Sequence, residues 1–236
     1  MNLRWAETKH IRISTKIRGS VEKVYVTEGV AEYVVSLFPF AYVGVCVDIG
    51  AFDPMWTSNS WLFEQMGWDV YCIEPNTNCI PGLKKYRNNV LEYACSNFNS
   101  DNEELFIFNS PNLLENKYAA GTGLIDHRLG DEPVRHIDLY DGKIIVKVRT
   151  LDWIMENEVK KNSIDYLSID VEHNELNTLM GISFDRWKPK VISIENIDQE
   201  DTRQVDYLSD RHYRRVHRIV FNDFYIIEDY YKLRFG

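Results

Sequence analysis

The chain has 236 residues, enough for one large domain or two small ones, and 44% of them are hydrophobic, as is usual for a soluble globular protein. Its 36 acidic residues outnumber its 27 basic ones and give a net charge of −9, whereas a domain that binds long nucleic acids usually has a basic surface. No apolar run approaches the ~18 residues of a membrane span, and no apolar signal-peptide region follows Met1. The four cysteines lack metal-ligand spacing. We therefore expect a soluble cytoplasmic protein.

The first half of the chain alternates between helices and apolar strands. Residues 1–40 are interpreted as an N-terminal extension and one helix that belong to the same domain as the rest. Apolar residues at helical spacing predict helices at residues 27–39, 56–66 and 76–86. Apolar runs predict core strands at residues 43–50, 69–74 and 91–96. We expect Pro81 and Gly82 to interrupt the third helix.

The second half contains a long segment without periodicity. Residues 109–142 are rich in Asn, Gly, Pro, Asp and His, and we expect them to form a substrate-loop insertion. Around this segment, strands are predicted at residues 104–108, 143–149, 164–170 and 191–195. Helices are predicted after a cap at Thr150 or Asp152, and at residues 176–180 and 199–209. The last predicted element is a hairpin of residues 214–220 and 224–228 that turns at Asn222 and Asp223.

This order of elements predicts an α/β fold. Apolar strands that alternate with helices are typical of a parallel sheet with helices on both faces. The terminal hairpin would add an antiparallel edge to that sheet. No repeat and no linker divides residues 41–236, so we expect a single domain there.

A glycine turn follows the first core strand, where residues 45–54 read VCVDIGAFDP. A dinucleotide site needs the pattern G-x-G-x-x-G, because the backbone must approach a pyrophosphate. Here the second and third glycines are missing, and Asp48 would add negative charge beside an anion. S-adenosylmethionine has no phosphate and carries an ammonium and a sulfonium, which a carboxylate favours. We therefore expect S-adenosylmethionine to contact Asp48, Gly50 and Ala51.

An acidic residue also ends the second core strand. Glu74 can accept two hydrogen bonds from ribose hydroxyls there, although NAD enzymes use the same acid. Pro75, Ser96 and Asp170 are further candidate cofactor contacts. The alternative is an ordinary turn with surface acids.

A second group of polar residues follows the fourth and fifth predicted core strands. Asp170 ends one strand, and Glu195 and Asn196 end the next. In a parallel sheet these side chains meet at the carboxyl edge, where open α/β sheets bind their ligands. Two carboxylates and an amide oxygen suit Mg²⁺ or a similar divalent cation, which could hold a substrate hydroxyl and lower its pKa. The alternative is a set of unpaired acids or helix caps.

His173 lies three residues beyond Asp170, at the predicted ligand edge. A neutral imidazole there could remove the proton from a hydroxyl that attacks a methyl group, so His173 and Asp170 are the candidate catalytic residues. The alternative is a polar turn residue. Glu172, His127 and Arg128 are weaker candidates for contacts with the substrate, and the two in the long loop are equally consistent with solvated positions.

Taken together, these residues resemble the FkbM family of S-adenosylmethionine-dependent methyltransferases. The similarity spans roughly residues 44–230 and is carried by the motifs VDIGAFDP, SNSWLFEQMGW, YCIEPN, VRTLDWI, IDYLSIDVEHNEL and VISIEN. It implies a class I (Rossmann-like) methyltransferase fold over residues 41–236, with a seven-stranded, mostly parallel sheet. It also implies O-methylation of a sugar, a glycan precursor or a related small molecule.

Two sets of residues match positions in the family's motifs. Asp48, Gly50 and Glu74 match its cofactor positions, and the D-x-E-x-x-E pattern is matched by Asp170, Glu172 and Glu175. His173 departs from the family, which usually has glycine at this position. In this respect the chain is similar to metal-dependent O-methyltransferases of catechols and macrolide sugars, which place a Lys or His base three residues after a metal-binding Asp.

Two alternatives to this enzyme remain open. One is a binding protein that keeps the cofactor fold without catalysis. The other is an RNA methyltransferase, which the net charge disfavours. We expect a small-molecule or carbohydrate partner and no long nucleic acid. The sequence leaves the oligomeric state open, a homodimer included.

Overall fold

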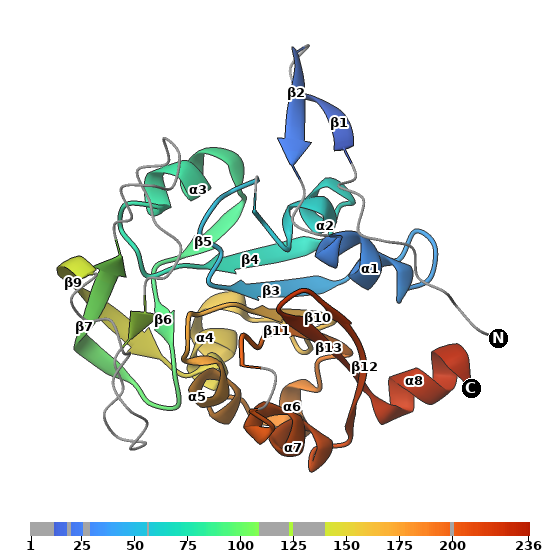
Figure 1. Cartoon of the computed structure of the whole chain (residues 1–236). Coiled ribbons are helices and arrows are strands. Elements are labelled where there is room, and N and C mark those ends of the chain that lie inside the picture. Colours follow the sequence, from blue (N-terminus) through green and yellow to red (C-terminus); the bar gives the residue numbers. More distant parts are fainter. Residues whose placement is uncertain are drawn as a thin grey trace.

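A seven-stranded sheet forms the centre of the protein in the computed structural model (Figure 1), which describes residues 12–17, 20–25, 29–55, 57–108, 123–124, 140–198 and 201–236. The strand order is β12-β13-β11-β10-β3-β4-β5. The bounds are β3 (Val45–Ile49), β4 (Asp69–Ile73), β5 (Asn89–Leu91), β10 (Tyr166–Ile169), β11 (Val191–Glu195), β12 (Tyr213–Ile219) and β13 (Asn222–Ile227). Strands β11, β10, β3, β4 and β5 are parallel, which confirms the predicted α/β class and mostly parallel sheet.

Apolar side chains cover both faces of this sheet. Along β3, Val47 and Ile49 belong to one buried cluster and Cys46 belongs to another. This alternation follows from the two-residue period of a strand. The first cluster is closed by α4 (Leu151–Ile154), η3 (Met155–Val159), α5 (Glu175–Met180), α6 (Phe184–Trp187) and α7 (Arg203–Ser209). The second is closed by α1 (Val30–Ser36), α2 (Trp61–Gln65) and α3 (Ile80–Tyr86).

The terminal hairpin lies at one edge of the main sheet, as predicted, and its strand β13 runs antiparallel to both β11 and β12. The position of its turn differs from the prediction. Its turn lies at Val220 and Phe221, whereas Asn222 and Asp223 already belong to β13. Asp223 is fully buried and forms ion pairs with Arg215 and Arg218, which explains why it lies inside the strand and not at the tip.

The predicted strand at residues 91–96 is divided between two sheets. β5 ends at Leu91, and β6 (Ala94–Cys95) joins a second sheet of order β6-β9-β7-β8 that the sequence did not predict (Figure 1). The other members are β7 (Ser100–Phe108), β8 (Gly123–Leu124) and β9 (Tyr140–Arg149). A small apolar cluster that includes Leu105 and Val146 holds this sheet together.

Several smaller predictions can be compared with the structure. Pro81 and Gly82 do not interrupt α3, because they lie in its first turn, where proline is tolerated. Thr150 caps α4 by accepting a hydrogen bond from the Trp153 backbone nitrogen at 3.2 Å. The weak alternation of apolar residues at positions 10–17 allows a short strand or a mobile segment, and β1 (Arg12–Ile17) lies there. The sequence did not predict its partner β2 (Ser20–Tyr25) or the last helix, α8 (Glu228–Phe235).

The four cysteines are buried and unpaired, as small apolar residues in a core. In the part of the chain that the structure describes, no helix has both the length and the apolar character needed to cross a bilayer. Most of the expected loop at residues 109–142, with His127 and Arg128, lies outside the described residues.

Candidate active site

Only glycine fits at position 50, because the backbone that follows a neighbouring strand lies against it. Gly50 follows β3 with a left-handed φ of 84°, and a Cβ at this position would lie 1.7 Å from the backbone oxygen of Asp170. The Gly50 nitrogen donates to the oxygen of Ile73 at 2.9 Å, and the Asp170 nitrogen donates to the oxygen of Ile49, also at 2.9 Å. The carboxyl ends of β3, β4 and β10 therefore meet at Gly50, and only glycine fits there.

Asp48 lies inside a buried polar network. Its Oδ2 accepts a hydrogen bond from the Ser60 hydroxyl at 2.5 Å, and Ser60 in turn accepts one from Arg87 Nη2 at 2.7 Å. Arg87 also forms an ion pair with Glu64 and donates to Ser58 Oγ at 3.0 Å. Burial raises the pKa of Asp48, while the Ser60 hydrogen bond and the Arg87 charge act in the opposite direction. Asp48 thus anchors the segment that follows the glycine turn.

The sequence interpretation missed Arg87 and its partners. Their shared feature is that they come from different elements, so no spacing motif connects them. Arg87 follows α3, Glu64 lies in α2 and Ser60 precedes α2. The one signal was the motif SNSWLFEQMGW, which contains both Ser60 and Glu64 without showing what they contact.

Glu74 joins the loops that follow β3 and β4. Its Oε2 accepts from the Phe52 backbone nitrogen at 2.9 Å, and its Oε1 accepts from that of Asn76 at 2.7 Å. Burial raises the pKa of Glu74 to about 7. Each carboxylate oxygen has a second lone pair, so both can still accept a hydroxyl. Since Ile49 pairs with Ile73, the parallel register places Glu74 beside the Gly50 turn.

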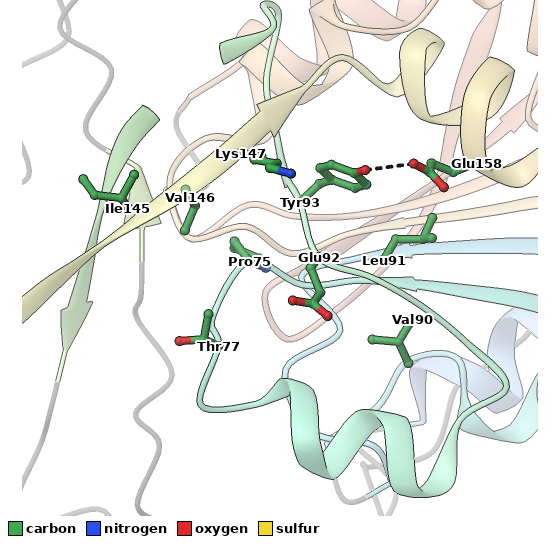
Figure 2. A pocket seen from close by; sticks show the side chains of 10 residues that line it. All are labelled: Pro75, Thr77, Val90, Leu91, Glu92, Tyr93, Ile145, Val146, Lys147 and Glu158. Carbon is green, nitrogen blue, oxygen red and sulfur yellow. Dashed lines mark hydrogen bonds between the residues drawn. The ribbon is translucent and has the colours of Figure 1, made fainter. Parts of the chain in front are cut away.

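A pocket opens at Pro75, the residue after Glu74, between the end of β5 and β9 (Figure 2). Its volume is about 430 Å³, within the range of small-molecule sites. The lining includes Pro75, Thr77, Leu91, Tyr93, Val146 and Lys147. The Tyr93 hydroxyl donates to Glu158 at 2.8 Å and fixes one wall. Pro75, a predicted cofactor contact, therefore lies on a cavity.

Ser96 is packed inside the protein. Its side chain is fully buried, and its hydroxyl has no hydrogen-bond partner among the described residues. The Ser96 nitrogen donates to the oxygen of Arg149 at 3.2 Å, and a Cβ on Gly181 would lie 2.3 Å from the Ser96 oxygen. These contacts hold β6 against the end of α5. A role of Ser96 in cofactor binding stays a prediction.

Three carboxylates converge at the ends of β10 and β11. One oxygen from each of Asp170, Glu172 and Glu195 can be chosen so that all three lie within 4.8 Å of one another. The parallel pairing of Ile169 with Ile194 brings the two strand ends together. Burial, and then repulsion between these neighbouring carboxylates, raises the pKa of both Asp170 and Glu195. Glu195 Oε2 is buried and has no hydrogen-bond partner in the described structure. Such a cluster needs protons or a cation to offset its charge.

Asn196 directs its amide nitrogen toward the terminal hairpin. The side chain is buried and donates to Asp223 Oδ2 at 3.1 Å. Its backbone oxygen accepts a hydrogen bond from Arg218 at 2.6 Å. Two of the predicted metal ligands, Asp170 and Glu195, meet in the carboxylate cluster. The third member of the cluster is Glu172, which was predicted as a substrate contact.

The turn after Asp170 holds two consecutive left-handed residues. Glu172 has a φ of 55° and His173 a φ of 75°. Glu175 Oε1 stabilises the turn by accepting from the backbone nitrogens of Val171 at 3.3 Å and His173 at 3.1 Å. Burial raises the pKa of Glu175 to about 8. Glycine adopts such a φ without strain, so the left-handed backbone at His173 is unfavourable for its side chain. The imidazole of His173 is exposed.

Comparison with known proteins identifies one family. No curated protein and no solved structure matches the chain. A family model described as the Methyltransferase FkbM domain matches residues 48–223, more than half of the 236 residues. The matched segment contains the glycine turn, Glu74 and the three clustered carboxylates. The chain therefore belongs to the FkbM family of methyltransferases.

Proposed function

We propose that this methyltransferase uses S-adenosylmethionine to methylate a hydroxyl of a sugar, a glycan precursor or a related small molecule. The observation that carries the proposal is the contact of the Asp170 backbone with Gly50. It joins the cofactor half of the sheet, with Glu74, to the acidic cluster at one carboxyl edge. Methyl transfer requires a donor and an acceptor to meet in one place, and orientation of this kind can contribute several kcal/mol to lowering the barrier.

The cofactor half suits a cationic nucleoside. Glu74 is held by the Phe52 and Asn76 backbone nitrogens, so its remaining lone pairs are positioned for the two ribose hydroxyls. The carboxylates of Asp48 and Glu74 would repel a pyrophosphate but favour a ligand with an ammonium group. S-adenosylmethionine supplies an electrophilic methyl group when bound.

The acidic cluster suits a hard divalent cation. Its carboxylate oxygens are the ligands that Mg²⁺ prefers, and a cation would offset the repulsion between Asp170, Glu172 and Glu195. A cation held there would lower the pKa of an acceptor hydroxyl. His173 follows the cluster with an exposed imidazole, so in this proposal it removes the hydroxyl proton.

Calorimetric titration with S-adenosylhomocysteine tests the cofactor assignment. The wild type should bind, and Glu74→Gln should bind at least tenfold more weakly, because an amide cannot accept from both backbone nitrogens and two hydroxyls. Glu92→Gln is the matched control, since Glu92 is an exposed acid on the rim of the nearby pocket. Failure of the wild type to bind would refute the proposed function.

The pKa of Glu74 adds a pH dependence to this test. Its folded pKa of about 7 exceeds its ordinary value of 4.5, so the ligand-free folded protein binds this proton more tightly than the unfolded chain does. The contribution of Glu74 to stability is therefore fully present below about pH 4.5 and is lost as the pH rises toward 7. Affinity for S-adenosylhomocysteine should rise over the same window, because the ionised carboxylate is the better acceptor. In Glu74→Gln the rise should disappear.

Thermal unfolding in the presence of Mg²⁺ tests the metal assignment without an activity assay. A ligand at 100 times its Kd stabilises the folded state by about 2.7 kcal/mol, which shifts the midpoint by several degrees in a protein of this size. Mg²⁺ added after rigorous chelation should produce such a shift in the wild type and not in Glu195→Gln. The control is Glu158→Gln, which keeps all three clustered carboxylates. Equal midpoints with chelator and with Mg²⁺ in the wild type would rule out the site.

A further inference from the structure

The tip of the terminal hairpin has its polar residues inside and its apolar residues outside. Val220 and Phe221 form the turn and are 43% and 47% exposed, whereas Asp223 is fully buried. Ile197, which follows Asn196, is 46% exposed. We call Ile197, Val220 and Phe221 the apolar lip. Such exposure is unfavourable in water, and grouped exposed apolar residues commonly mark a binding surface.

The turn is also strained. Val220 has a φ of 49°, in the left-handed region that β-branched residues avoid. Two-residue hairpin turns normally place glycine, asparagine or aspartate at such positions. Here Asn222 follows the turn without occupying it. Strained residues of this kind gather at ligand sites, where the surrounding contacts hold them.

Arg218 fixes the apolar lip beside the acidic cluster. Its Nε donates to the Val220 oxygen at 3.0 Å, and its Nη2 donates to the Asn196 oxygen at 2.6 Å. The Asn196 nitrogen donates to the Phe221 oxygen at 2.7 Å. Since Glu195 pairs with Asn222 across β11 and β13, the turn lies next to a residue of the cluster. The lip is thus a rigid border of the candidate active site.

We propose that the apolar lip binds an apolar group of the methyl acceptor, so that the acceptor is an amphipathic glycoside with an alkyl or aryl group attached to its sugar. The inference rests on the proposed function and names the substrate class for the same site. The cluster faces the hydroxyl, and the lip faces the apolar group. An anionic group such as a phosphate is a poor alternative, because the three clustered carboxylates next to the lip would repel it.

Methyl transfer to paired acceptors tests the inference. The probes are octyl and methyl glycosides of glucose, galactose, mannose and rhamnose, kept below micellar concentrations. The wild type should show at least a tenfold higher kcat/KM for the octyl form of an accepted sugar, in line with the discrimination that apolar contacts supply. Phe221→Ser should lose this preference, because its kcat/KM for the octyl form should fall toward the value for the methyl form. Phe40→Ser, which alters a fully exposed phenylalanine before β3, should keep it.

A second variant separates specificity from stability. Val220→Gly suits the left-handed backbone, so its thermal midpoint should rise while the preference for octyl glycosides falls.

Equal kcat/KM for octyl and methyl forms in the wild type, or no transfer to either form while S-adenosylhomocysteine still binds, would overturn the inference and leave the cofactor assignment intact. A wild-type dimer that dissociates in Phe221→Ser would overturn it as well, because the lip would then join two copies of the chain. Loss of S-adenosylhomocysteine binding in the wild type would refute the proposed function itself.

Discussion

Replacing Gly50 by alanine should unfold the protein or lower its free energy of unfolding by about 4–5 kcal/mol, the upper end of single-substitution effects. The new Cβ would lie 1.7 Å from the backbone oxygen of Asp170, and the φ of 84° already disfavours any side chain. Neither backbone can move easily, because both strands are hydrogen-bonded inside the main sheet. Urea denaturation followed by circular dichroism measures the loss.

The matched control for this substitution is Gly67→Ala. Gly67 has nearly the same φ, 87°, and nothing lies within 4 Å of the position that a Cβ would occupy. Gly67→Ala should lower the free energy of unfolding only by the backbone strain, about 1–2 kcal/mol. The difference between the two variants therefore measures the contact between β3 and β10. Equal losses would show that the strand ends separate easily and that the two half-sites are not rigidly joined.

Replacing His173 by alanine should lower the rate of methyl transfer at least ~100-fold, the lower end of what a general base contributes. The exposed imidazole follows the carboxylate cluster, and its backbone is held by Glu175. Affinity for S-adenosylhomocysteine should stay unchanged, because the cofactor half of the sheet is not altered. Initial rates of methyl transfer to an accepted glycoside measure the loss.

His173→Gly distinguishes a catalytic role from a structural one. The φ of 75° suits glycine, so this variant should be as stable as the wild type or more stable. If the imidazole acts in the reaction, His173→Gly should transfer methyl groups slowly although its thermal midpoint is raised. If turnover stays near normal in both variants, His173 has no part in the mechanism, and its side chain is only a polar turn residue.

Local patterns were sufficient to predict most of the main sheet. The strand predicted at residues 191–195 coincides with β11, because all but one of its residues are buried and its apolar run is therefore visible in the sequence. The prediction of one strand at residues 91–96 was wrong. The strand breaks at Glu92 and Tyr93 because the residues after the break pair with β9, which lies far along the chain. The hairpin turn was misplaced for a related reason. Asn222 and Asp223 have the composition of a turn, but Arg215 and Arg218 draw Asp223 inside.

The sequence by itself determined which edge of the sheet carries the candidate site. Parallel strands bring their carboxyl ends to one edge, so acids and a glycine at the ends of apolar runs are sufficient to place Gly50, Glu74, Asp170 and Glu195 together. Only the tertiary structure decided how these residues are held and what borders them. The Asp170 oxygen against Gly50, Arg87 behind Asp48 and Arg218 beneath the apolar lip are contacts between distant parts of the chain. Their partners are selected by packing in three dimensions, which leaves no regular spacing in the sequence.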